Sequence, residues 1–341
     1  MGLSSNSLSA GAVGGKSPVR HLNPSALALI SADAKLETLF ESDSSFEGPT
    51  WVPDGISGYL LFTDAPKNVI RRLNPDGSVT PFLENIFAGK DISQAYQTFG
   101  LDGAKKYRML GANSTALDPQ GRVVYCAYSD GQIIRLDAGG QRTVLASHYL
   151  GRRINAPNDL VFGSDGSLYF TDSRADTKHA DGDGVPHKGV YVLTAGEVQL
   201  LSKDIDHPNG LTLSADEKYL YVTNSMLKNI LRFEVRDGEI TNGIVFADMS
   251  GKDEIGAPDG IKVDRYGNVY STGPGGVWIF SSNGEHIGSI LTPIKITNLA
   301  FGGSDYQDLY MTGSGAMTGS GAVYRIRLNY SARETSSERT Q

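Results

Sequence analysis

Short stretches of alternating apolar and polar residues recur along most of the chain and are separated by Asp/Gly turns. A typical unit begins with a polar and a small residue, continues into a short strand, turns, and enters an aromatic-rich strand such as Leu168–Phe170. A third strand follows, for example Gly189–Leu193, and ends at another turn. Alternation of period two bounded by Gly and Asp is typical of β-strands joined by tight turns. The pattern therefore predicts an antiparallel meander.

This unit occurs six times. The repeats begin at Glu47, Asn113, Asn158, Asn209, Asp259 and Thr297, so successive starts lie 66, 45, 51, 50 and 38 residues apart. A four-stranded propeller blade takes about 40–50 residues. The sequence therefore predicts an all-β fold, a six-bladed β-propeller with four antiparallel strands in each blade.

The sixth repeat lacks the fourth strand that the other five contain. Those five strands are predicted at 79–83, 142–146, 198–202, 244–247 and 286–291. The N-terminal segment Lys35–Phe40 has the pattern of the missing strand. Pairing it with the last blade would close the ring and leave no open sheet edge. We therefore predict a flexible segment 1–26, a single propeller domain 27–330 and a disordered tail 331–341.

Composition fits a fold with many turns and narrows the class of partner. The 341 residues include 41 glycines and one cysteine, with a formal charge of −7. Glycine is thus more frequent than its ordinary ~7%. The acidic balance gives no basic stripe for nucleic acid and no polybasic patch for a membrane. No apolar run approaches the ~18 residues of a membrane span. We expect a soluble monomer or weak homo-oligomer that acts on a small molecule.

Two further expectations concern the cysteine and the compartment. A single cysteine cannot form an intramolecular disulfide, and Cys126 lies in an apolar run, which predicts a core residue. The first twenty residues lack the apolar core of a signal peptide. A cytoplasmic location and a periplasmic or secreted one, reached through a removed signal peptide, both stay open.

The residues that begin the six repeats are the candidates for chemistry. The first strand of each propeller blade lines the central channel, so these residues should form a ring at one of its ends. All six side chains carry an oxygen acceptor. Asn or Asp before Gly also suits a turn, but turn chemistry gives no reason to select Glu47. Two carboxylates facing each other across a channel repel unless a cation or a proton lies between them.

These donor types predict one hard divalent cation. Two carboxylates balance its charge and amide oxygens complete its coordination. The predicted ligands are Glu47, Asn158, Asn209 and Asp259. Ca²⁺, which takes roughly 6–8 oxygen ligands, fits this set better than Zn²⁺, which prefers nitrogen or sulfur. Zn²⁺, Mg²⁺ and Mn²⁺ remain alternatives.

Four ordered motifs resemble the gluconolactonase and regucalcin (senescence-marker protein) family of six-bladed propellers. They are Glu47–Trp51, Pro157–Asp159, Pro208–Leu211 and Pro258–Gly260, and the similarity covers about residues 36–328. The resemblance implies a hydrolase of ester bonds, a gluconolactonase-like lactonase. It also implies a single catalytic metal on the four predicted ligands, with Asp259 as the general base. On this hypothesis Asn113 and Asn158 hydrogen-bond the substrate.

One departure from the family bears on specificity. Many members that act on sugar lactones carry a basic residue two places before the asparagine, where this chain has Ala156. The loop 173–188, with Arg174, is therefore expected to bind substrate and set specificity. The alternative is that this loop and the loop 85–111 are plain surface excursions.

Two other functions stay open. The same metal site could serve a metal-dependent aryl-esterase or phosphotriesterase. The propeller could also be a non-catalytic binding scaffold, because fold does not fix function. The two convergent acids, Glu47 and Asp259, argue against the scaffold.

Overall fold

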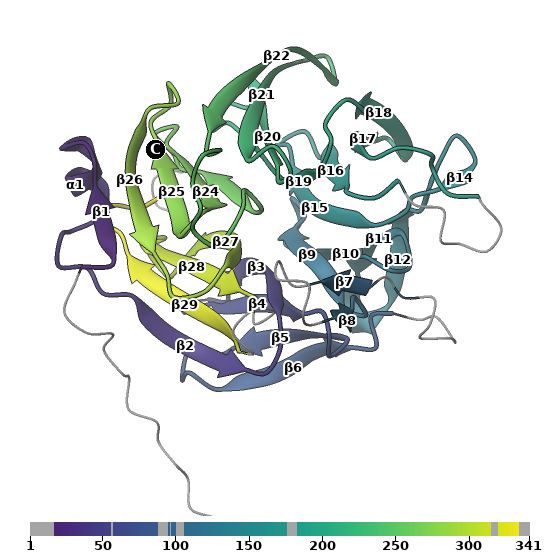
Figure 1. Cartoon of the computed structure of the whole chain (residues 1–341). Coiled ribbons are helices and arrows are strands. Elements are labelled where there is room, and N and C mark those ends of the chain that lie inside the picture. Colours follow the sequence, from purple (N-terminus) through teal and green to yellow (C-terminus); the bar gives the residue numbers. More distant parts are fainter. Residues whose placement is uncertain are drawn as a thin grey trace, which may run out of the picture.

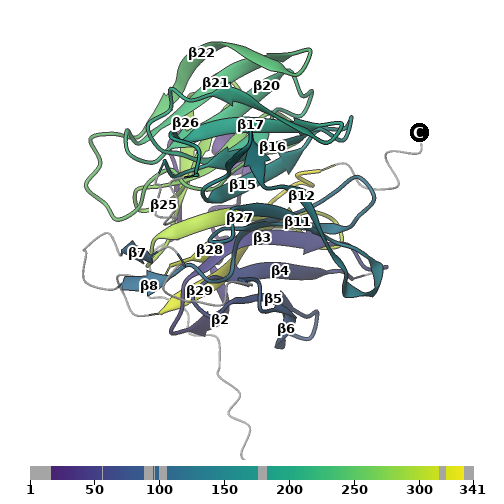
Figure 2. The same cartoon turned by 90° about the vertical axis from the view of Figure 1, so that its right-hand side faces the viewer.

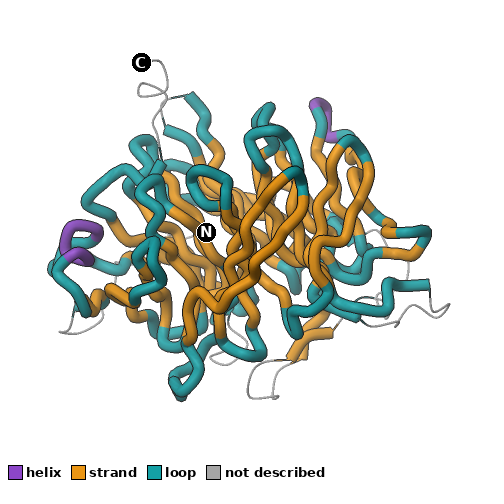
Figure 3. The backbone as a smooth tube through the Cα atoms, turned by 90° about the horizontal axis from the view of Figure 1, so that it is seen from above, coloured by secondary structure: helices purple, strands orange, loops and turns teal. Residues whose placement is uncertain are grey.

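The computed structural model describes residues 17–55, 57–87, 95, 97–99, 106–175, 183–314 and 320–333. Six antiparallel sheets follow one another around a ring (Figure 1). Strands form the blades (Figure 3), and in the described ranges helix lies at the periphery, at α1 (Ser25–Leu29) and a 3₁₀ turn at Ala138–Gly140. The predicted six-bladed propeller is confirmed. No helix in the described ranges is long and apolar enough to cross a membrane.

Five blades are formed by consecutive strands. The first contains β3 (Phe46–Val52), β4 (Tyr59–Asp64), β5 (Val69–Leu73) and β6 (Val79–Glu84). The second contains β9 (Ala112–Leu117), β10 (Val123–Ala127), β11 (Gln132–Leu136) and β12 (Arg142–Ala146). The third contains β15 (Pro157–Phe162), β16 (Leu168–Asp172), β17 (Gly189–Thr194) and β18 (Glu197–Ser202). The fourth contains β19 (Pro208–Leu213), β20 (Tyr219–Asn224), β21 (Asn229–Arg236) and β22 (Glu239–Asp248). The fifth contains β23 (Ile261–Val263), β24 (Val269–Gly273), β25 (Gly276–Phe280) and β26 (His286–Leu291).

The last blade is assembled from both ends of the chain. It contains β27 (Ile296–Gly302), β28 (Asp308–Gly313), β29 (Gly321–Arg327) and the N-terminal β2 (Glu37–Ser42). β2 pairs antiparallel with β29, from Glu37 opposite Arg325 to Ser42 opposite Gly321. The two strands run side by side in Figures 1 and 2. This confirms that the N-terminal segment supplies the missing strand.

Described residues outside the predicted bounds 27–330 contact the propeller at both ends. β1 (Val19–His21), in the segment predicted to be flexible, pairs with β26 and gives the fifth blade an extra strand. At the other end Ala332, in the predicted tail, is buried, and its N–H donates to the carbonyl of Tyr306 (2.9 Å). Residues 1–16 and 334–341 lie outside the described part of the chain.

Two short hairpins accompany the predicted insertions. They are β7 (Gln97–Phe99) with β8 (Lys106–Arg108), and β13 (His148–Tyr149) with β14 (Arg152–Arg153). Much of the loops 85–111 and 173–188 lies outside the described residues.

The core consists of apolar clusters between neighbouring blades, one for each of the six interfaces. Successive side chains of a strand point to opposite faces. Leu60 and Phe62 therefore pack toward the last blade, whereas Leu61 packs toward the second. Burial on both faces explains why the strands are almost continuously apolar. Cys126 is a fully buried free thiol between the second and third blades, as predicted, and burial raises its pKa.

A candidate metal site at one end of the channel

The structure places the six ring residues at equivalent points of the blades. Glu47, Asn113, Asn158, Asn209 and Thr297 are each the second residue of a first strand, and Asp259 lies two residues before β23. All six are buried, with exposed fractions between 3% and 8%. Their common position follows from the repeat, because every blade enters the ring in the same register.

Hydrogen bonds join neighbouring blades at all six junctions of this ring. The bonds are, in order around the ring, Thr63 Oγ1 to Asn113 O (3.0 Å), Asn113 Nδ2 to Asn158 O (3.1 Å), Thr171 Oγ1 to Asn209 O (2.6 Å), Gly210 N to Asp259 O (3.1 Å), Gly260 N to Thr297 O (2.8 Å) and Thr297 Oγ1 to Phe46 O (2.6 Å). Five of the six acceptors are backbone carbonyls of ring residues themselves. These six hydrogen bonds form a belt around the channel, and this hydrogen-bond belt fixes the starting points of the first strands relative to one another.

The carboxylates of Glu47 and Asp259 influence each other across this ring. Burial, and next to it the Asp259 carboxylate, raise the pKa of Glu47 well above its usual value, while the ammonium of Lys295 lowers it. One Glu47 oxygen, Oε2, accepts a hydrogen bond from the adjacent Gly48 N–H (3.1 Å). Two buried acids so placed need a positive charge or a proton nearby.

Lys295 supplies a positive charge that the sequence reasoning missed. Its Nζ lies 2.8 Å from Asp259 Oδ2, and the residue directly precedes β27 of the last blade. A signal for it exists in the sequence. Lys295 stands two places before the ring residue Thr297, as His207 stands two places before Asn209. The other four positions of this kind hold Ser45, Gly111, Ala156 and Ala257.

His207 belongs to the same end of the channel. Burial, together with Lys188 and Arg174, lowers its pKa, and the carboxylate of Asp259 opposes them. Its backbone carbonyl accepts the N–H of Ser225 (3.2 Å). The structure therefore places the His207 ring in the electrostatic field of Asp259.

Asn158 and Asn209 are oriented through their amide nitrogens. Asn158 Nδ2 donates to Ser173 Oγ (3.4 Å) and Asn209 Nδ2 to Ser225 Oγ (3.0 Å). The amide oxygens are the acceptors that remain. Asn209 Oδ1 is buried and has no hydrogen-bond partner among the described residues. An unmet buried acceptor costs about 1–3 kcal/mol, and a hard cation is a partner that would satisfy it.

The remaining two ring residues bind their neighbours instead. The Thr297 hydroxyl donates to Phe46 O and contacts Thr312 Oγ1 (3.1 Å). The Asn113 amide nitrogen donates to the carbonyl of Asn158. In the described ranges no three His, Cys, Asp or Glu side chains gather closely enough to hold a metal, so a metal held here needs the amide oxygens.

Arg174 reaches the ring through two intermediate hydroxyls. Its Nε donates to Tyr128 Oη (2.9 Å), and this hydroxyl lies 3.4 Å from Ser173 Oγ, the partner of Asn158. Tyr128 is nearly fully buried and packs with Ala156 in a small apolar cluster. The predicted substrate-binding residue is thus connected to Asn158.

A second polar layer lies one residue further along the first strands. Asp159 accepts a hydrogen bond from Ser114 Oγ (2.6 Å), and its own charge adds to the field that raises the pKa of Glu47. Lys262 Nζ donates to the carbonyl of Ile261 (3.0 Å) and interacts electrostatically with Asp159. The charges of Asp159 and Lys262 therefore oppose each other beside the ring.

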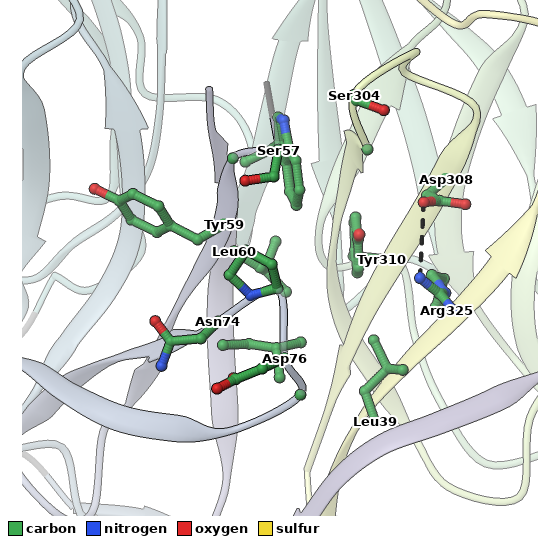
Figure 4. Close-up of a pocket in the computed structure, with 16 residues that line it drawn as sticks. Leu39, Ser57, Tyr59, Leu60, Asn74, Asp76, Ser304, Asp308, Tyr310 and Arg325 are labelled. Atoms are coloured by element: carbon green, nitrogen blue, oxygen red, sulfur yellow. Dashed lines mark ion pairs between the residues drawn. The ribbon is translucent and has the colours of Figure 1, made fainter. Parts of the chain in front are cut away.

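Two cavities lie away from the ring, between blades. One of about 420 Å³ lies between the first and last blades, where Asp308 pairs with Arg325 (Figure 4). Another of about 400 Å³ lies between the third and fourth blades and is lined by residues such as Tyr169 and Glu217. Both adjoin the turn after a first strand, and neither is lined by a ring residue. Their recurrence at equivalent interfaces indicates packing gaps of the repeat.

Comparison with known proteins connects this architecture to one family. Residues 46–315 match the model of the SMP-30/Gluconolactonase/LRE-like region. A gluconolactonase of Zymomonas mobilis is 30% identical over 284 residues, which cover 80% of this chain and 76% of the relative. A gluconolactonase structure from Xanthomonas campestris superposes with a TM-score of 0.75 at 29% identity, covering 95% of this chain and 99% of that one. The structure of a calcium-binding regucalcin from Agrobacterium tumefaciens shares the fold, with a TM-score of 0.63 at 21% identity and coverage of 86% and 94%.

Proposed function

The chain belongs to the SMP-30/gluconolactonase/LRE-like family, whose members include ester-hydrolysing lactonases, and on this premise we propose that it is a metal-dependent lactonase. The proposal of a bound metal rests on the arrangement of the ring residues. Two buried acids, Glu47 and Asp259, share one field, and the Asn209 amide oxygen is buried without a partner. The relative from Agrobacterium is called calcium-binding, which agrees with the oxygen donors.

The residues that would hold the cation are Glu47, Asn158, Asn209 and Asp259. A bound divalent cation would polarise the lactone carbonyl and stabilise the negative charge that forms on its oxygen. Ca²⁺ is the ion we propose, because carboxylate and amide oxygens are its usual ligands in proteins.

Asp259 is the proposed general base. Its backbone is held on both sides, since its carbonyl accepts Thr223 Oγ1 (2.7 Å) and its N–H donates to Thr272 Oγ1 (2.7 Å). The carboxylate takes a proton from water as the water oxygen attacks the carbonyl carbon. When the acyl C–O bond of the lactone breaks, that proton passes to the lactone's former ring oxygen, and the product is a hydroxy acid.

Substrate contacts are proposed for Asn113, Asn158 and Arg174. Asn158 is fixed through Ser173, and Arg174 is fixed through Tyr128. Ala156 leaves no cation two places before Asn158, whereas His207 and Lys295 occupy the equivalent places of the fourth and sixth blades. The basic side chains at these equivalent places thus come from the fourth and sixth blades and not from the third.

The test is hydrolysis of a panel of γ- and δ-lactones, aryl esters and a phosphotriester, followed by pH-stat with Ca²⁺ or with a chelator. We expect chelator-sensitive opening of lactones that exceeds hydrolysis of the other esters. Asp259→Asn should abolish the rate. Asp118→Asn is the matched control, because Asp118 is equally buried but lies at the other end of β9 from Asn113. A full rate in chelator, or in Asp259→Asn, would refute the proposal, and preference for the phosphotriester would favour the alternative esterase.

A further inference from the structure

Lys295 has no role in the proposed mechanism, yet it is the cation that contacts the proposed base. Its Nζ lies 2.8 Å from Asp259 Oδ2 and its charge also acts on Glu47. The start of β27 is fixed, because the Lys295 carbonyl accepts the N–H of Ser314 (3.0 Å). The Lys295 side chain is 22% exposed, against 8% for Asp259.

The charges at this end of the channel can be summed. Glu47 and Asp259 contribute two negative charges, and the proposed divalent cation cancels them. Lys262 and Asp159 in the layer below cancel each other. Lys295 then adds one positive charge in direct contact with a ring carboxylate. The opening of a lactone creates one negative charge, first on the carbonyl oxygen and then on the product carboxylate, so the two are complementary.

We propose that Lys295 is an anion-binding residue of this site, which adds a positive charge to the metal-loaded ring and binds the carboxylate formed when the lactone opens. This inference rests on the proposed metal-dependent function. It has two consequences that are independent of turnover. Lys295 repels the divalent cation and shares Asp259 with it, so it weakens metal binding. It also attracts small carboxylates, so it strengthens binding of the product.

The experiment compares the wild type with Lys295→Gln, which removes the charge, and Lys295→Arg, which keeps it. Lys218→Gln is the control, because Lys218 is an exposed lysine whose partner is Asp216 (3.1 Å). Calorimetry measures Ca²⁺ binding, and inhibition measures binding of 4-hydroxybutanoate, the product of γ-butyrolactone. We expect Lys295→Gln to bind Ca²⁺ about tenfold more tightly and 4-hydroxybutanoate about tenfold more weakly, with Lys295→Arg and Lys218→Gln near wild type.

The outcomes separate this inference from the function on which it rests. If the wild type binds no Ca²⁺ and hydrolyses lactones in chelator, the proposed function fails. If the wild type is a Ca²⁺-dependent lactonase but Lys295→Gln binds Ca²⁺ no more tightly, or binds 4-hydroxybutanoate as well as the wild type, the role of Lys295 is refuted. Thermal denaturation checks that each variant is folded, and Lys295→Arg supplies the comparison if Lys295→Gln is not.

Discussion

The hydrogen-bond belt predicts that two similar threonines will differ in their effect on activity. Thr63 and Thr223 are both fully buried, and each donates its hydroxyl to the carbonyl of the next blade's ring residue. Thr63 holds Asn113 (3.0 Å), whereas Thr223 holds the proposed base Asp259 (2.7 Å). The substitutions Thr63→Val and Thr223→Val keep the shape of each side chain and remove only this donor.

Thr63→Val should lose more stability than Thr223→Val, whereas Thr223→Val should lose more activity. Asp259 O keeps a second donor, the N–H of Gly210 (3.1 Å), so Thr223→Val should cost about 0.5–1.5 kcal/mol. Thr63→Val should cost about 1–3 kcal/mol, the penalty for an unmet buried acceptor. With about 2.1 cal/mol/K of unfolding entropy per residue, these costs lower Tm by roughly 1–4 °C for a chain of 341 residues. Thr223→Val should nevertheless lose about tenfold or more in kcat, because a base displaced by a fraction of an ångström transfers protons poorly.

The assay is thermal denaturation combined with lactone hydrolysis at saturating Ca²⁺ and a temperature well below both midpoints. Thr63→Val should retain most of its kcat despite the larger loss of stability. If activity instead falls in proportion to stability in the two variants, the threonines act only on folding, and the assignment of Thr223 as a positioning residue is wrong.

Three further predictions follow from the ring. Glu47→Gln should weaken Ca²⁺ binding ~100-fold by calorimetry, because it removes one of two anionic ligands. In chelator the wild type should also lose stability relative to this variant as the pH rises. The pKa of Glu47 is raised in the folded protein, so protonation stabilises the folded state at low pH, and this contribution is lost as the pH rises through that raised pKa. Ca²⁺ at about 100 times its Kd should stabilise the folded wild type by about 2.7 kcal/mol in urea denaturation, and no change in midpoint would contradict a site in the folded ring. Tyr128→Phe removes the hydroxyl that binds Arg174 and should raise KM several-fold with little change in kcat; an unchanged KM would show that Arg174 does not depend on Tyr128 to bind substrate.

The order of blades was predictable because the repeat is expressed in residue patterns that have only one structural solution. Strands such as β25 are apolar at every position, which favours a neighbour on both faces, and six such repeats favour a closed ring. The closing strand was predictable because the last repeat lacks one strand and β2 has its pattern. β1 was not, since three residues are too few to show a period, and its pairing depends on the exposed edge of β26.

The candidate site was predictable only in part, because a repeat identifies equivalent positions and not the contacts between them. The second residue of each first strand was located, yet Lys295 stands before its strand and enters the ring by the reach of a long side chain. A threonine recurs near the end of the second strand in five blades, as Thr63, Thr171, Thr223, Thr272 and Thr312. Whether its hydroxyl reaches a carbonyl of the next blade depends on the distance between adjacent blades, which a local sequence pattern does not determine.

Closure of the ring bears on the chemistry as well as on stability. Glu47 lies in the first blade and Lys295 at the start of the last, so the interface between these two blades, where β2 of the last blade leads directly into β3 of the first, sets their separation. That interface is held by the Thr297 hydroxyl on Phe46 O, by Trp51 stacked on Tyr310 with ring centroids 5.5 Å apart, and by β2 on the outer edge. Small shifts there change the separation of Glu47 from Lys295 and Asp259, and Coulomb energy in a buried site varies steeply with such separations. The strand that completes the last blade therefore helps to set the charge balance of the proposed metal site. Loosening this interface should alter metal affinity before it unfolds the other blades.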